Sequence, residues 1–404
     1  MNWQPYRMEN PIMHYAWGSR GPKAFIPRLL GLENVEPNKP FAELWMGAHP
    51  SAPSRVVTAQ GVIPLNELVA TYPSEALGDR VLQKFGPVLP FLFKVLSAAE
   101  ALSIQVHPNK KQARELHNRD PEHYPDENHK PEVAIALDSL DALVGLKSST
   151  QIFEVCEKYP EVAALVGGKV SSGPPLEVFE RIINLSIESP STIADVVDKL
   201  VGRLSIKTED ERSFVETLFL DLCTKYSNDD VGLILLFLLE HKRLKTGDGM
   251  YIPAGVPHAY ICGNIVECMA NSDNVVRAGL TPKYKDVRTL LSIMDYSAKP
   301  RHFRTGGKAT FTYDVPAEEF KVVRWMANDG DVFRGPCDSG PAVILVVDGK
   351  AYVRWVSEST DGKMSLDRGN SVFVPAIINS APNSWRLEAV ENTLIFIVTV
   401  PVSA

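Results

Sequence analysis

Residues 247–258 carry the sequence GDGMYIPAGVPH, in which a glycine turn and a short apolar strand lead to a second turn that exposes a histidine. Residues 369–380 repeat the first part of this pattern as GNSVFVPAIINS, with a glycine again before a strand that ends at Pro-Ala. Where the first copy has His258, the second has Ser380. The repeat predicts two related strand-rich barrels, of which only the first carries this potential metal ligand.

Two further segments offer ligands that could join His258. Gln105 and His107 are two residues apart, so their side chains share one face of a strand. Glu132 opens a second apolar run. Two imidazoles, a carboxylate and an amide oxygen suit a divalent ion, with Zn²⁺ first. Taken one by one, Gln105 could equally be an ordinary amide and Glu132 an exposed strand carboxylate.

Composition narrows the class of protein. The chain has 404 residues and a formal net charge of −7, which argues against a general nucleic-acid or membrane-surface binder. Its longest apolar run, 231–239, is too short to span a bilayer, and its first residues lack the features of a secretory signal. Five scattered cysteines without a Cys-x-x-Cys pair indicate reduced thiols. We expect a cytoplasmic monomer with neither a nucleic-acid nor a membrane partner.

The spacing of apolar residues changes twice along the chain. Residues 1–150 consist mostly of short apolar runs and turns, whereas 151–243 carry apolar residues at helical spacing. Strand texture returns over 244–310 and continues over 311–404. We therefore expect a first domain in two parts, 1–150 and 244–310, split by an all-α insert at 151–243 and followed by a second strand-rich domain at 311–404.

Several individual elements can also be placed. Asn109 is a suitable cap for a helix that begins at Lys110. A further helix is expected over 231–242. Asp-Gly at 348–349 lies between two apolar runs and predicts a β-hairpin, and 394–400 reads as a closing strand.

The repeat resembles a signature of the cupin superfamily. The first copy matches the second cupin motif, G-x5-P-x-G-x2-H-x3-N, at every fixed position except the last, where Cys262 replaces the asparagine. The set Gln105-x-His107 and Glu132 then resembles the first cupin motif with a long insertion. This resemblance implies a mainly β fold of two cupin-type jelly-roll barrels with an inserted all-α domain, the second barrel lacking metal ligands. It does not imply a reaction.

A narrower resemblance concerns five longer segments, which are similar to the type I phosphomannose isomerases. They are AELWMGAHP at 42–50, LPFLFKVL at 89–96, ALSIQVHPNK at 101–110, NHKPE at 128–132 and SDNVVRAGLTPK at 272–283.

The resemblance implies one zinc ion per chain and a sugar phosphate as substrate. The departures are small: Asn271 stands where family members vary, and Cys262 misses only the broader cupin pattern. Carried over residue by residue, the zinc ligands fall on Gln105, His107, Glu132 and His258, the catalytic arginine on Arg277, and other active-site positions on Lys94, Ser103, Lys130, Glu267, Asp273 and Lys283.

These residues suit the interconversion of mannose 6-phosphate and fructose 6-phosphate through a cis-enediol or enediolate. A metal near the C1 and C2 oxygens would stabilise the developing charge, and a base must move the proton between C2 and C1. The sequence leaves the base and the ring-opening group open among four candidates: His129, Lys130, Glu267 and Asp273.

The remaining polar and aromatic residues are assigned to the substrate. Arg277 offers a planar, permanently charged fork, and Lys283 is a candidate for the 6-phosphate. Tyr260 follows the His258 turn and could line the pocket; Trp17 could line it or belong to the core. Two alternatives remain open at this point, another metal-dependent cupin such as an oxygenase, or a sugar-binding cupin without turnover.

Overall fold

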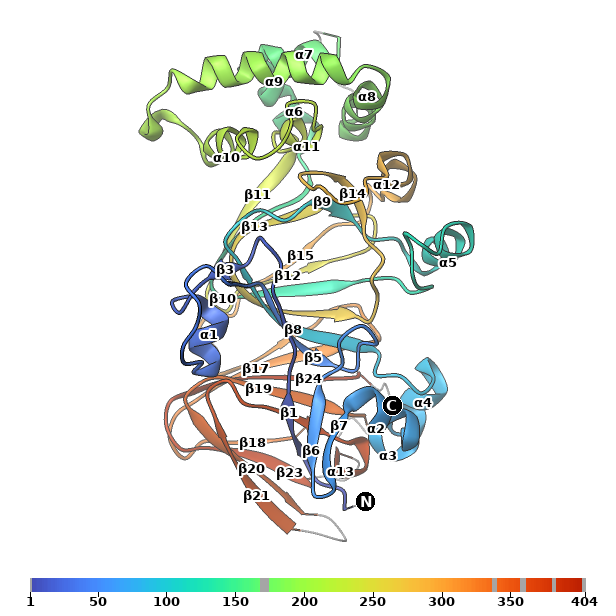
Figure 1. The fold of residues 1–404 in the computed structure, drawn as a ribbon, viewed down its shortest axis with the longest axis vertical. Coiled ribbons are helices and arrows are strands. Elements are labelled where there is room, and N and C mark those ends of the chain that lie inside the picture. Colours follow the sequence, from blue (N-terminus) through green and yellow to red (C-terminus); the bar gives the residue numbers. More distant parts are fainter. Residues whose placement is uncertain (1, 168–173, 336–339, 357–360, 380–382, 402–404) are drawn as a thin grey trace.

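Figure 1 shows the computed structural model as an elongated molecule. Helices lie at one end, a large sheet occupies the middle, and further sheets form the other end. The expected high strand content is confirmed, but the fold is mixed and not mainly β, because helices also make up a substantial part of the chain. Cys337 and Ser380 lie outside the described residues. The residues that the structure describes are 2–167, 174–335, 340–356, 361–379 and 383–401.

The central sheet has ten strands among the described residues and is organised around β10 (Glu132–Leu146). This strand pairs antiparallel with β13 (His258–Ala270), β11 (Leu239–Lys245) and β12 (Gly249–Ile252). All eight residues of β8 (Phe91–Ala98) are buried, which explains why this segment reads as an almost continuous apolar run. The other strands of this sheet are β2 (Ile12–Met13), β5 (Glu43–Gly47), β9 (Ile104–Val106), β14 (Val276–Gly279) and β15 (Arg301–Phe303).

The helical segment begins after β10 and ends at β11, two strands that pair with each other. The chain therefore leaves and re-enters the sheet at neighbouring positions. The helix expected over 231–242 is wrong in its second half, because 239–245 form β11: hydrogen bonding to β10 overrides the local helical pattern. The helices of this segment are α6 (Ser149–Lys158), α7 (Pro160–Leu165), α8 (Pro175–Glu188), α9 (Pro190–Ser205), η1 (Glu209–Glu211), α10 (Phe214–Cys223) and α11 (Gly232–Leu235).

Two sheets at the other end pack against each other through one apolar cluster. The predicted turn at Asp348-Gly349 is present, but the hairpin is wrong: the strand before it lies in the eight-stranded sheet and the strand after it in the four-stranded one. Gly349 has a φ of 76°, a conformation that suits this sharp change of direction. In sheet order, the larger sheet contains β16 (Thr310–Tyr313), β17 (Lys321–Ala327), β24 (Thr393–Thr399), β19 (Ala342–Asp348), β22 (Ser371–Val374), β1 (Tyr6–Glu9), β6 (Arg55–Thr58) and β7 (Gly61–Pro64), and the smaller contains β18 (Val332–Arg334), β23 (Trp385–Ala389), β20 (Lys350–Val356) and β21 (Asp361–Asp367).

The N-terminal segment contributes to both ends of the strand-rich region. β1 pairs with β22 of the C-terminal part, whereas β2 pairs with β5 in the central sheet. Figure 1 shows the blue N-terminal strands beside the red C-terminal ones. Strands from the two ends of the chain therefore share one sheet.

Short helices complete the fold around these sheets. Asn109 caps α5 (Lys110–Arg119), because its side chain accepts a hydrogen bond from the Gln112 N–H, as the sequence predicts. Among the described residues, none of the helices combines the length and the apolar character that a membrane span requires. The other short elements are α1 (Phe25–Leu30), α2 (Leu65–Thr71), α3 (Pro73–Leu77), α4 (Asp79–Phe85), α12 (Val287–Ile293), α13 (Ala376–Asn379), β3 (Ser19–Arg20) and β4 (Pro40–Phe41).

Candidate metal centre and active site

Three neighbouring strands bring the four predicted ligands together. Gln105 in β9 lies opposite His258 at the start of β13, and His107 follows β9 by one residue. Glu132 is the first residue of β10. Ligand atoms of His107, Glu132 and His258 all lie within 4.8 Å of one another, so residues far apart in the sequence converge on one point.

His107 is held so that only one of its ring nitrogens faces this point. Its Nδ1 lies 2.9 Å from the Asn274 carbonyl oxygen, to which a proton on Nδ1 would be donated. Nε2 is buried without a hydrogen-bond partner and lies 3.4 Å from Glu132 Oε2. Burial, with Lys130 nearby, lowers the pKa of His107 to about 4, so the ring is neutral near pH 7. A neutral imidazole with an unused buried nitrogen is what a metal ligand requires.

His258 is oriented in the same manner by the turn that precedes it. Its Nδ1 lies 2.9 Å from the Val256 carbonyl oxygen, and its Nε2 lies 3.0 Å from Glu132 Oε1 and 3.3 Å from the Gln105 amide nitrogen. A rotation of that amide about its last bond exchanges its nitrogen and oxygen, which places the oxygen toward His258. The turn depends on Gly255, whose φ is 80° and whose added Cβ would lie 2.7 Å from Asp295.

The Glu132 carboxylate lies between these groups and stays ionised. Burial acts to raise its pKa, but Lys130 and the two histidines lower it well below the usual value. Tyr260 donates a hydrogen bond of 3.1 Å to Oε1, and Lys130 Nζ lies 3.6 Å from Oε2. Two imidazoles, one carboxylate and one amide form a donor set that fits a tetrahedral zinc ion.

Lys94 and two further carboxylates form a second charged group near Glu132. Lys94 Nζ lies 3.4 Å from Glu43 Oε2 and 3.5 Å from Glu267 Oε2, and it stands over the Trp45 ring at 5.0 Å. Burial lowers the pKa of Lys94, but the two carboxylates outweigh it and raise the pKa, so the amine is a cation. Burial and Glu132 raise the pKa of Glu267. Lys94 and Glu267 therefore form a buried ion pair with shifted pKa values, and such groups are candidates for a functional site.

Arg277 and Lys283 supply positive charge on another side. Arg277 in β14 lies opposite Gln105, and burial lowers its pKa without removing its charge. Lys283 Nζ stands over the Tyr15 ring at 5.4 Å, and burial together with Arg277 lowers its pKa. Arg277 is partly buried and Lys283 is exposed, and two cations that repel each other favour an anion between or beside them.

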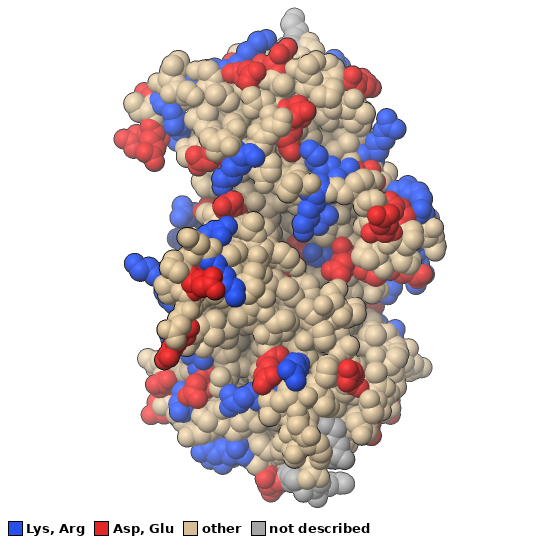
Figure 2. Space-filling view, in the orientation of Figure 1, with Lys and Arg blue, Asp and Glu red and all other residues tan. Residues whose placement is uncertain are grey.

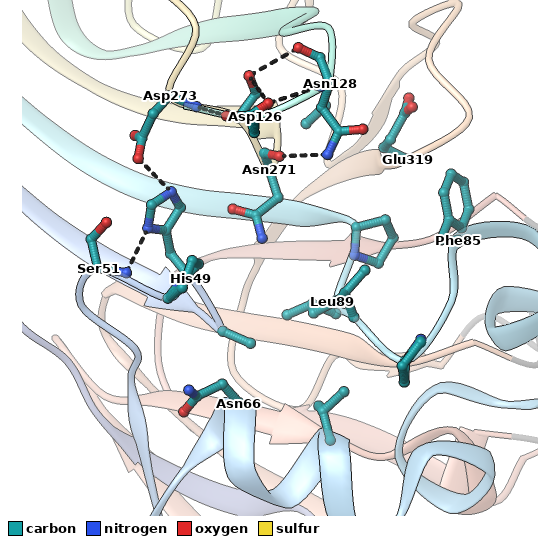
Figure 3. Close-up of a pocket in the computed structure, with 18 of the residues that line it drawn as sticks. His49, Ser51, Asn66, Phe85, Leu89, Asp126, Asn128, Asn271, Asp273 and Glu319 are labelled. Carbon is teal, nitrogen blue, oxygen red and sulfur yellow. Dashed lines mark hydrogen bonds and ion pairs between the residues drawn. The ribbon is translucent and has the colours of Figure 1, made fainter. Parts of the chain in front are cut away.

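Two of the four candidate proton carriers point elsewhere. His129 Nε2 lies 2.7 Å from Glu319 Oε1, away from Glu132. Asp273 Oδ2 lies 3.4 Å from His49 Nε2, and this pairing lowers the pKa of Asp273. Figure 3 shows His49 between Asp273 and Ser51, lining a neighbouring pocket. The structure thus places Lys130 and Glu267 nearer to the ligand cluster than His129 and Asp273, whose side chains are engaged by Glu319 and His49.

The remaining predicted residues lie at the edge of the cluster. Ser103 directly precedes β9. Trp17 stacks on Tyr15, with ring centroids 5.8 Å apart, and packs against an apolar cluster. No role was predicted from the sequence for Glu43, Asn274 or Tyr15. Glu43 and Asn274 lie inside quoted segments, but nothing in their residue types distinguishes them from ordinary strand or loop residues.

Comparison with known sequences identifies one family. A family model described as "Phosphomannose isomerase type I, catalytic domain" matches residues 6–149. A mannose-6-phosphate isomerase from Ogataea parapolymorpha is 38% identical over 402 residues, which cover 91% of this chain and 92% of that protein. One from Rattus norvegicus is 35% identical over 95% of this chain and 96% of its own length.

Solved structures of similar fold agree with the sequence comparison. A mutant phosphomannose isomerase from Salmonella typhimurium has a TM-score of 0.83 and 29% identity, covering 98% of this chain and 99% of that one. A mannose 6-phosphate isomerase bound with zinc and yttrium has a TM-score of 0.82 and 27% identity over the same shares.

Proposed function

The chain belongs to the type I phosphomannose isomerases, and from that membership we propose that it interconverts D-mannose 6-phosphate and D-fructose 6-phosphate with one zinc ion per chain. The observation that carries this proposal is the convergence of His107, Glu132 and His258 on one buried point in a chain that matches its relatives over nearly its whole length. The same match favours the isomerase over another metal-dependent cupin, such as an oxygenase or a sugar-binding protein.

The residues that would hold the zinc ion are Gln105, His107, Glu132 and His258. Bound there, the ion supplies a Lewis acid that lowers the cost of negative charge on the sugar oxygens. The protein contributes two imidazoles whose orientation is fixed by the Asn274 and Val256 carbonyl groups.

The proton that moves between C2 and C1 is assigned to Lys130 or Glu267. Both adjoin the ligand cluster: Lys130 contacts Glu132 directly, and Glu267 acts on Tyr260, which donates a hydrogen bond to Glu132. Burial raises the pKa of Glu267, which brings it closer to the range in which a carboxyl group can both accept and return a proton. Asp273 and His129 are the weaker candidates, because each is engaged by a partner outside the cluster.

Lys94 and Tyr260 are assigned to positioning the sugar, and Arg277 is assigned as a catalytic residue. Lys94 is a cation held by two carboxylates and can donate to a sugar hydroxyl. Tyr260 stays protonated, because burial and Glu132 raise its pKa well above the usual value, so its hydroxyl acts as a donor. Arg277 and Lys283 supply the charge that a 6-phosphate or an oxyanion requires, while Ser103 and Trp17 are assigned to the pocket rim.

The architecture that we infer is a cupin-type catalytic barrel built from 1–150 and 244–310, a helical insert at 151–243, and a cupin-like second barrel at 311–404 without metal ligands. The adjacency of β10 and β11 supports the insert, because the helices between them leave and return at paired strands. β1, β6 and β7 lie in the same sheet as β22, so the N-terminal segment adds three strands to the second barrel.

We infer a cytoplasmic monomer that binds neither nucleic acid nor membranes. The net charge of −7 argues against a nucleic-acid or membrane partner, and Figure 2 shows acidic and basic residues interspersed over the visible face. Light scattering of the purified protein tests the oligomeric state.

The reaction is tested by incubating the purified protein with mannose 6-phosphate and measuring fructose 6-phosphate. Turnover that a chelator abolishes and zinc restores is the expected result. Absence of turnover in zinc-loaded protein would contradict the proposal. In D₂O, we expect deuterium to enter the product at the transferred position. Full retention of the carbon-bound hydrogens would replace solvent-exchanging proton transfer with a hydride shift or a shielded proton.

A further inference from the structure

A cavity lies beside the His49–Asp273 pair (Figure 3). Its volume is about 710 Å³, ample for a hexose phosphate. Asp273 and His49 stand in its wall, and the next residue, Asn274, contacts His107 through its carbonyl oxygen, so this cavity adjoins the ligand cluster. None of the four proposed metal ligands lines it. We call it the His49 cavity.

The polar wall of the His49 cavity contains buried oxygens that lack partners. Asn66 Oδ1, Asn271 Oδ1 and Glu319 Oε2 are each buried without a hydrogen bond among the described residues. The Glu319 residue is only 6% exposed, and its other oxygen is engaged by His129. In Figure 3 the Asn271 amide reaches toward the space between His49 and Leu89, with Asn66 on the opposite wall. Buried acceptors are rarely left unsatisfied, so these oxygens favour an occupant that donates hydrogen bonds.

The other carboxylates in this wall are already satisfied. Asp126 accepts hydrogen bonds from the Ser272 hydroxyl and the Asp273 N–H, and Asp273 pairs with His49. An apolar side of the cavity, including Phe85 and Leu89, offers contact for the carbon face of a sugar. The groups left for a ligand are therefore acceptors and an apolar wall.

The rim carries a cation, Lys110, whose charge acts on Glu319 without forming a close ion pair. Lys110 and Arg114 of α5 both line the cavity, and none of the ion pairs within the described part of the chain involves Lys110. Arg114 pairs with Glu127 at 3.8 Å, and Lys84, also in the lining, pairs with Glu318 at 2.9 Å. An exposed ammonium at the rim above a wall of acceptors favours a ligand with hydroxyl groups at one end and an anionic group at the other.

We propose that the His49 cavity is a second binding site for a phosphorylated sugar or polyol, with its hydroxyls on the oxygens of Asn66, Asn271 and Glu319 and its phosphate at Lys110. The proposal concerns binding and goes beyond the isomerisation. Failure of turnover would leave it standing, and failure of this second site would leave the isomerase proposal standing.

The experiment titrates the zinc-loaded protein with D-glucitol 6-phosphate, which has no carbonyl group to isomerise, and measures stoichiometry by calorimetry. We expect two molecules per chain. Lys110→Glu should weaken one of the two at least tenfold, and Asn66→Leu should weaken the same one. Arg277→Ala should instead weaken the other. The matched control is Lys111→Glu, the same charge change one residue along α5 at a position outside the lining, with Lys111 87% exposed.

A single molecule per chain in the native protein would overturn the proposal, as would two molecules whose affinities Lys110→Glu leaves unchanged. Lys110→Glu alters an exposed residue, so it keeps the test decisive even if Asn66→Leu fails to fold. Inorganic phosphate and unphosphorylated glucitol are titrated separately, and each should bind this site at least tenfold more weakly. Equal affinity of inorganic phosphate would overturn the assignment of the hydroxyls to Asn66, Asn271 and Glu319.

Discussion

The two copies of the glycine–strand–Pro-Ala pattern begin alike and end differently. Gly247 and Gly369 have nearly the same φ, 82° and 83°, and the strands β12 and β22 follow each at the same distance. After Pro-Ala, the first copy turns at Gly255 and delivers His258 to Glu132 at 3.0 Å. The second copy continues instead into the short helix α13.

The second ending is structural. Ile378 packs in the apolar cluster of the C-terminal sheets, and Asn379 accepts a hydrogen bond of 2.7 Å from Trp385 while donating one of 2.8 Å to the Gly340 carbonyl. The same strand can therefore be followed by a ligand or by a packed corner. The comparison teaches that the chemistry depends on the few residues after the strand.

The largest expected effect comes from removing the ligand that only the first copy has. His258→Ala should lower isomerase activity by ~1,000-fold or more, because the site loses a nitrogen donor and the several kcal/mol that a bound Lewis acid contributes. The measurement is zinc content per chain together with turnover. Ile377→Ala, just after Pro-Ala in the second copy, is the control and should retain both zinc content and turnover. Full zinc occupancy with normal turnover in His258→Ala would contradict the claim that the first copy supplies a metal ligand that the second copy lacks.

The next effect tests a residue outside the repeat. Arg277→Lys should lower kcat by ~100-fold while zinc content stays unchanged, because the charge remains but the planar fork is lost. Steady-state kinetics on mannose 6-phosphate measure this. A kcat close to that of the native protein would remove Arg277 from the catalytic residues.

A smaller effect ranks the ligands within the first copy's site. Gln105→Ala should weaken zinc retention by ~10-fold, less than His258→Ala, since an amide oxygen is the poorer ligand for zinc. Competition with a coloured chelator measures both affinities. If the order were reversed, Gln105 would be the stronger ligand and the amide's secondary role would be wrong.

The smallest effect concerns the turn rather than the metal. Gly255→Ala should lower the free energy of unfolding by ~1–3 kcal/mol, because φ is positive there and a Cβ would meet Asp295 at 2.7 Å. Ile377→Ala, at the matching position of the second copy, should change it by less than ~0.5 kcal/mol, since Ile377 is 44% exposed. Denaturant unfolding compares the two. Equal losses would mean that the two turns are equally strained.

Much of this site could be predicted from single segments. The alternation that places Gln105 and His107 on one strand face is local, and so are the cap at Asn109 and the turn before His258. Glu132 was a candidate because it begins an apolar run, and the family resemblance then supplied Arg277, which no local pattern connects to the site. Residues that act through a partner stayed hidden: Asn274 matters through its backbone carbonyl, which any residue type would provide.

The errors have one physical origin, pairing between distant strands. The pattern over 231–242 is helical by itself, but β10 offers hydrogen bonds that turn 239–245 into a strand. Asp348-Gly349 forms its turn, yet β24 and β22 pair with the strand before it and β23 and β21 with the strand after it. The place of β1 beside β22 is likewise invisible along the chain. Local sequence gives the turn and the strand, and tertiary pairing decides the sheet.

The central claim is that the first copy, and not the second, completes a zinc site of two histidines, one glutamate and one glutamine. X-ray absorption at the zinc edge of the purified protein tests it most directly. The predicted result is one zinc ion per chain, with nitrogen and oxygen donors at about 2.0–2.2 Å and no sulfur, and loss of one imidazole contribution in His258→Ala. A sulfur shell at about 2.3 Å, or a spectrum that His258→Ala leaves unchanged, would contradict the claim.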